Sequence, residues 1–93
     1  MKPTLRTPTG WAKQRNALVR IHKFPTFVDA IGFVNKLAFY AESVDHHPDL
    51  KISYRTVTIE WTTHDAAGVG KDAAGGVTKK DVDGARFTST LLA

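Results

Sequence analysis

The feature that most constrains the fold of this chain is the apolar pattern between residues 26 and 44. Thr26 is a favourable N-cap, and Asp29 occupies the third helical position, as in a capping box. Pro48 must lie beyond the helix, because the residue before a proline avoids the α region. Apolar spacings of three and four are typical of an amphipathic helix. The residues predicted to form its buried face are Phe27, Ala30, Ile31, Val34, Leu37, Ala38, Ala41 and Val44, and Phe33 and Tyr40 are predicted to widen this face on one flank.

Strand patterns lie on both sides of this helix. Residues 17–24 are rich in strand-forming side chains and stop at Pro25, and residues 11–16 can form a short edge strand. Two further strands are expected at residues 50–55 and 56–63, where apolar residues alternate with polar ones. The side chains predicted to share the buried face of these two strands are Leu50, Ile52, Tyr54, Val57, Ile59 and Trp61.

A last helix is predicted to follow Thr78, with Asp81 at its third position as a second capping box. The order is therefore strand, strand, helix, strand, strand, helix. This order predicts the α+β class, with a four-stranded antiparallel sheet and both helices packed on one of its faces. Residues 1–10, with two prolines and a glycine, are predicted to be an irregular N-terminal arm, and residues 11–93 a single domain.

The composition narrows the classes of function. The 93 residues include no cysteine, which excludes disulfides, thiolate metal sites and thiol catalysis. The net charge is +4, but the basic residues are scattered and do not alternate with aromatic ones, so direct nucleic-acid binding is not expected. No apolar run is long enough to cross a membrane, and the N-terminus has no apolar signal region. We therefore expect a cytoplasmic protein, which can also be nuclear.

Three of the four histidines are placed where a site could form. His46 and His47 leave the predicted helix, and His64 leaves the last strand, whereas His22 lies inside a strand pattern and is given no role. An unperturbed imidazole has a pKa of about 6.5, so such groups can donate and accept protons near neutrality. From these residues alone, a proton-transfer site, a metal site and purely structural histidines all stay open.

The pattern of these residues resembles that of the pterin-4a-carbinolamine dehydratases. The resemblance extends over nearly the whole chain, from residue 10 to the acid Asp81. The residues that carry it most specifically are Glu42, His46, His47, Pro48, Tyr54 and His64. It implies an enzyme that converts 4a-hydroxytetrahydrobiopterin to quinonoid dihydrobiopterin and water, in tetrahydrobiopterin recycling. It also implies a homodimer or homotetramer, and neither a metal nor a cofactor.

The resemblance further implies which residues act. The catalytic groups would be His46, His47 and His64, exchanging protons with the hydroxyl group and the ring nitrogen. The residues that would bind the pterin are Glu42, His46, His47, Pro48, Thr63, His64 and Asp65. Animal relatives also serve as the dimerisation partner of a transcription factor, so the alternative is a non-catalytic binding module. The chain departs from the family in its short N-terminal arm and in the near-repeat of residues 65–71 in residues 72–79.

Overall fold

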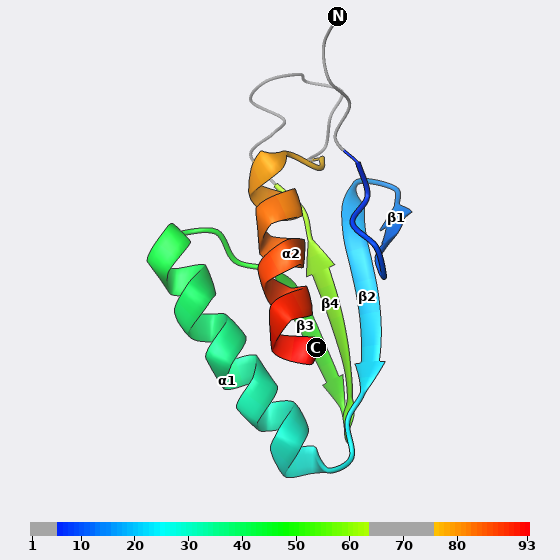
Figure 1. Ribbon diagram of the computed structural model, residues 1–93, viewed down its shortest axis with the longest axis vertical. Coiled ribbons are helices and arrows are strands. Elements are labelled where there is room, and N and C mark those ends of the chain that lie inside the picture. The colour runs from blue at the N-terminus through cyan, green and yellow to red at the C-terminus, as the bar shows by residue number, and fades with distance from the viewer. Residues whose placement is uncertain (1–5, 64–75) are drawn as a thin grey trace, which may run out of the picture.

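The computed structural model describes residues 6–63 and 76–93. Figure 1 shows a sheet with two helices against it, in the predicted order, which is thereby confirmed. The elements are β1 (Ala12–Gln14), β2 (Ala17–Lys23), α1 (Phe27–Val44), β3 (Asp49–Ser53), β4 (Thr56–Trp61) and α2 (Lys79–Leu92). The strands are ordered β1-β2-β4-β3, and each neighbouring pair is antiparallel.

Both helices cover the same face of the sheet. Val57, Ile59 and Trp61 alternate along β4 and are fully buried, and Leu18 of β2 lies opposite Trp61. Side chains from both helices join these four in one core. The helical members of this core that are themselves buried are Ala30, Phe33, Leu37 and Ala41 from α1, and Val82 and Ala85 from α2. Neither helix covers the opposite face of the sheet, and Ile21 on that face is 65% exposed in the part of the chain that the structure describes.

The prediction that Tyr54 faces the core is wrong. Tyr54 lies in the two-residue turn between β3 and β4, with φ of 56°, and its side chain is 71% exposed. Arg15 occupies the equivalent place between β1 and β2, with φ of 54°. Left-handed residues of this kind give a hairpin turn the twist that matches its strands, and the usual signal is Asn or Gly. The sequence lacks that signal here, so the strand pattern was extended too far.

The buried stripe of α1 is rotated and shorter than predicted. Phe33, predicted at the flank of this stripe, is buried in the core, whereas Phe27 and Val44 at the two helix ends are 48% and 44% exposed. Phe39, which does not fit the predicted stripe, is exposed. The helix has 18 residues, and its buried residues run only from Ala30 to Ala41.

The start of α1 gives a first test of local stability. The Thr26 hydroxyl accepts a hydrogen bond from the backbone N–H of Asp29 at 3.0 Å. We expect Thr26→Ala to lower the free energy of unfolding by about 1 kcal/mol, the usual cost of losing such a cap. Urea denaturation measures this, and Thr26→Ser, which keeps the hydroxyl, should stay close to the wild type. Equal loss in both variants would contradict the capping role.

Candidate functional site

The site begins where α1 ends. Asp45 takes a left-handed conformation (φ 53°, ψ 44°), and its N–H donates to the carbonyl groups of Ala41 and Glu42. The N–H of His46 then donates to the Ala41 carbonyl at 3.1 Å. These hydrogen bonds pair carbonyl groups that would otherwise lack a partner at the end of the helix. The left-handed Asp45 also turns the chain sharply, so that His46 and His47 leave the helix four residues after Glu42.

His46 is paired with Asp81 at the start of α2. Its Nε2 lies 2.6 Å from Asp81 Oδ1, and the two residues are 35 positions apart in the sequence. The His46 side chain is 12% exposed and the Asp81 side chain is fully buried. A carboxylate beside an imidazole fixes the orientation and the tautomer of the ring. Here the pair joins the exit of α1 to the entry of α2.

Asp81 is held by three further hydrogen bonds, all to Oδ2. The donors are the Thr63 hydroxyl at 2.6 Å, the Thr78 backbone N–H at 2.9 Å and the Thr78 hydroxyl at 3.3 Å. Such donors are needed, because a buried carboxylate without partners is strongly destabilising. Asp81 thus has two roles in one side chain: Oδ2 completes the capping box of α2, and Oδ1 receives His46.

The pairing leaves one nitrogen of His46 available. A carboxylate only accepts hydrogen bonds, so a neutral His46 ring paired with it carries its hydrogen on Nε2 and presents Nδ1 as an unprotonated acceptor. Nδ1 makes no hydrogen bond with any residue in 6–63 or 76–93. A neutral imidazole in this state can accept a proton at Nδ1 and later return it.

Trp61 fixes the plane of the same imidazole. The two rings are stacked, with centroids 5.5 Å apart and planes 27° from parallel. The indole is fully buried, and its Nε1 donates to the Thr88 hydroxyl at 3.0 Å. That hydroxyl donates in turn to the Gly84 carbonyl at 2.7 Å. His46 is therefore held at its edge by Asp81 and on its face by Trp61.

His47 has a different partner and a different environment. Its Nε2 lies 3.0 Å from Glu42 Oε1, and the two side chains are 56% and 82% exposed. Glu42, which the resemblance places among the pterin-binding residues, contacts His47 and not His46. Pro48, which is half-buried, follows directly and leads into β3. Two neighbouring histidines therefore form two separate imidazole–carboxylate pairs, one buried and one in solvent.

Thr63 joins the end of the last strand to this network. Its hydroxyl bonds to Asp81, and its backbone forms paired hydrogen bonds with Gly76 at 2.9 and 3.2 Å. His64 and Asp65, which the sequence also predicts in the site, lie outside the described residues. Among the described part of the chain, no group of three possible metal ligands comes together. No helix in that same part could span a bilayer.

A small pocket of about 80 Å³ opens beside His46. Tyr40, Lys80 and Asp83 line it together with His46 and Val44. The Tyr40 ring stacks on Phe87, with centroids 4.1 Å apart. Burial raises the pKa of Tyr40 above its usual value, and the charge of Asp83 raises it further, while Lys79 acts in the opposite direction. The Tyr40 hydroxyl is thus protonated at neutral pH and can donate a hydrogen bond.

Sequence reasoning missed the role of Trp61 and saw only half of the role of Asp81. Trp61 was predicted as a buried strand residue, which it is, but its stack with His46 depends on the path of the chain after α1. Asp81 was recognised in a capping box and in the family pattern. The available signal for a second role was that Asp81 is a capping acid, follows a glycine-rich segment and also matches the family pattern.

Comparisons with known proteins show the family of the chain. A family model described as Pterin 4 alpha carbinolamine dehydratase matches residues 1–91. A relative from Picosynechococcus sp., named "Putative pterin-4-alpha-carbinolamine dehydratase", is 51% identical over 73 residues, which are 78% of this chain and 71% of the relative. A relative of the same name from Mycolicibacterium smegmatis is 46% identical over 83 residues, 89% of this chain and 80% of the relative.

Solved structures show the same fold. The crystal structure of a transcriptional coactivator/pterin dehydratase from Brucella melitensis matches with a TM-score of 0.79 and 34% identity, covering 91% of this chain and 84% of that one. A pterin dehydratase-like protein identified as a RuBisCO assembly factor in the alpha-carboxysome matches in fold, with a TM-score of 0.62 and 20% identity over 87% of this chain and 84% of that one. With a family model that matches almost its full length, the chain belongs to the pterin-4a-carbinolamine dehydratase family.

Proposed function

We propose that this chain dehydrates 4a-hydroxytetrahydropterins by histidine acid–base catalysis. The observation that carries the proposal is the state of His46: its edge is bonded to a buried carboxylate, its face is stacked on Trp61, and its Nδ1 is free of described partners. A ring fixed in this way holds Nδ1 in one orientation, so it can accept or donate a proton there without reorganising. That is the property a general acid–base group needs.

The chemistry needs two proton transfers and no redox step. The bond between C4a and its hydroxyl oxygen breaks, and the oxygen leaves as water after it receives a proton. The hydrogen on N5 is lost, and its electron pair forms the C4a–N5 double bond of the quinonoid dihydropterin. One group that donates a proton and one that accepts a proton are sufficient, and both can work near neutral pH as imidazoles.

We assign these transfers to His46 and His64, with His47 binding the ring beside Glu42. Support for His64 comes from its neighbour in the chain, since Thr63 bonds to the same carboxylate that holds His46. Pro48 shapes the turn after the two histidines, and backbone groups of residues 63–65 would bond to the polar edge of the pterin. No metal is needed for this mechanism. We expect a homodimer or homotetramer, because the two helices leave one sheet face without cover from the described residues, and Ile21 is exposed on that face.

A second candidate function is the binding of a transcription factor as a non-catalytic dimerisation partner. It is favoured by the name of the Brucella melitensis structure, which joins transcriptional coactivator and pterin dehydratase. The enzyme is favoured by the buried pair of His46 and Asp81, which a scaffold would not need. One variant distinguishes the two functions. Loss of the His46 imidazole should stop dehydration and leave an external binding surface intact.

The test is the dehydration of freshly made 4a-hydroxytetrahydropterin, followed by ultraviolet absorbance. We expect His46→Ala to lower kcat/KM by about 10²–10⁴-fold, the usual contribution of a general acid–base group. The matched control is His22→Ala, a histidine in β2 whose ring packs against Phe24 away from the site. A wild-type rate equal to the buffer rate would refute the enzyme, and equal losses in both variants would refute the role of His46.

A further inference from the structure

A second pocket, distinct from the histidine site, lies where the N-terminal segment crosses the C-terminal half of α2. Its volume is about 430 Å³. Among the residues that the structure describes, every polar side chain on its wall is either cationic or a hydroxyl, and none is a carboxylate. The lining residues are Arg6, Thr7, Pro8, Thr9, Arg86 and Ser89.

The two arginines of this pocket are uncompensated. Within residues 6–63 and 76–93, neither Arg6 nor Arg86 forms an ion pair, and both are exposed. A guanidinium presents several N–H donors in a rigid fork that matches an oxyanion. Two such groups on the wall of one pocket, in a chain with a net charge of +4, create a local field that attracts anions.

Ser89 adds a hydroxyl donor to the same wall. Its oxygen already accepts from Trp11 Nε1 at 2.9 Å and from Arg20 Nη1 at 3.2 Å. A serine hydroxyl has two acceptor positions and one hydrogen, so with both positions filled its hydrogen is left to donate. No described residue accepts that hydrogen. The hydroxyl is therefore set as a donor to something outside the described chain.

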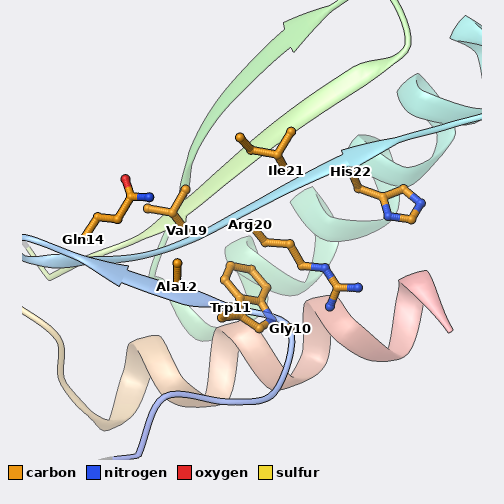
Figure 2. Close-up of a pocket in the computed structure, with 8 residues that line it drawn as sticks. All are labelled: Gly10, Trp11, Ala12, Gln14, Val19, Arg20, Ile21 and His22. Carbon is orange, nitrogen blue, oxygen red and sulfur yellow. The ribbon is translucent and has the colours of Figure 1, made fainter.

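The third arginine, Arg20, is held in place beneath Ser89. Figure 2 shows its side chain extending from β2 past Trp11 and Gly10. Gly10 has φ of 92°, and a Cβ there would lie 3.0 Å from Arg20 Nη1, so only glycine fits this close approach without strain. The charge of Arg20 thus adds to the field at Ser89, and the local packing keeps it there.

We propose that this pocket binds the phosphate group of a small phosphorylated molecule. Arg6 and Arg86 donate to its oxygens, the Ser89 hydroxyl completes the contact, and Arg20 supplies a fixed charge behind it. The ligand is expected to be an anion because the polar groups described above are guanidinium and hydroxyl donors. The pocket volume suits a small molecule. This inference does not depend on the proposed dehydratase activity, because the two sites share no residue.

The test is a titration with inorganic phosphate at low ionic strength, followed by amide chemical shifts. Shifts should gather at residues 6–10 and 86–89. We expect Arg86→Gln and Arg6→Gln each to weaken the affinity by about ten-fold or more, as for one hydrogen bond to a charged group. The matched control is Arg15→Gln in the β1–β2 turn, which removes the same charge from an exposed arginine and should change the affinity less than two-fold.

Three results would overturn the proposal. Equal weakening by Arg15→Gln would show general attraction to a basic protein and no built site. Shifts centred on other residues would place the anion elsewhere. A short single-stranded oligonucleotide could also shift the same amides. If it did so at a lower concentration of phosphate groups than inorganic phosphate or a phosphate monoester needs, and with a steep salt dependence, the pocket would be assigned to a nucleic-acid backbone. Circular dichroism confirms that each variant is folded.

Discussion

Replacing Asp81 by asparagine is expected to lower the dehydratase kcat/KM by about 10²–10⁴-fold, the range of a general acid–base contribution. The carboxylate oxygen accepts from Nε2 of His46 at 2.6 Å and so leaves Nδ1 as the bare nitrogen. An asparagine can present its NH₂ group to the ring instead. The ring would then carry its hydrogen on Nδ1, the wrong tautomer for accepting a proton there.

Asp81 also caps α2, so its proposed role in positioning His46 must be separated from its structural role. Loss of the buried hydrogen bonds should lower the free energy of unfolding by about 1–3 kcal/mol as well. Thr26→Ala serves as the stability-matched control, since it loses a helix cap far from the site and should keep its rate. The pH–rate profile and the ¹⁵N shifts of the His46 ring report on the tautomer directly. If Asp81→Asn lost stability but kept the wild-type rate and profile, the positioning role would be disproved.

Much of the fold followed from local patterns in the sequence. Thr26 and Asp29 predict the start of α1, and Thr78 and Asp81 predict the start of α2, because an N-cap and the residue it bonds to lie within four consecutive residues. The errors were also local. The turn at Tyr54 uses a left-handed residue other than Asn or Gly, which a propensity argument does not expect.

The sequence predicts residues for the candidate site, but it does not predict their pairings. His46 and His47 stand side by side in the sequence, yet one bonds to Asp81 across 35 positions and the other to Glu42 five positions back. Which imidazole turns inward depends on the left-handed conformation of Asp45, and on how α2 lies against β4. Tertiary packing decides such geometry, and one sequence contains no periodic signal for it.

The packing of α2 against β4 depends on a missing side chain. A Cβ at Gly84 would lie 2.6 Å from two atoms of the Trp61 indole and 2.8 Å from a third, far inside contact distance. The indole is fully buried, bonded to Thr88, and stacked on His46, so it has no room to yield. Glycine in a helix normally costs about 1 kcal/mol relative to alanine. At this position, the close packing of α2 on Trp61 that glycine allows outweighs that cost.

We therefore expect Gly84→Ala to lower the free energy of unfolding by about 1–3 kcal/mol, as overpacked cores do, in spite of the better helix propensity of alanine. Gly32 in α1 is the matched control: its Cβ would meet nothing within 4 Å, so Gly32→Ala should gain up to about 1 kcal/mol. Urea denaturation compares the two variants. Because a displaced Trp61 would also shift the His46 ring, kcat/KM should fall in Gly84→Ala and not in Gly32→Ala. A stabilised, fully active Gly84→Ala would show that the indole is free to move, and that His46 does not depend on it.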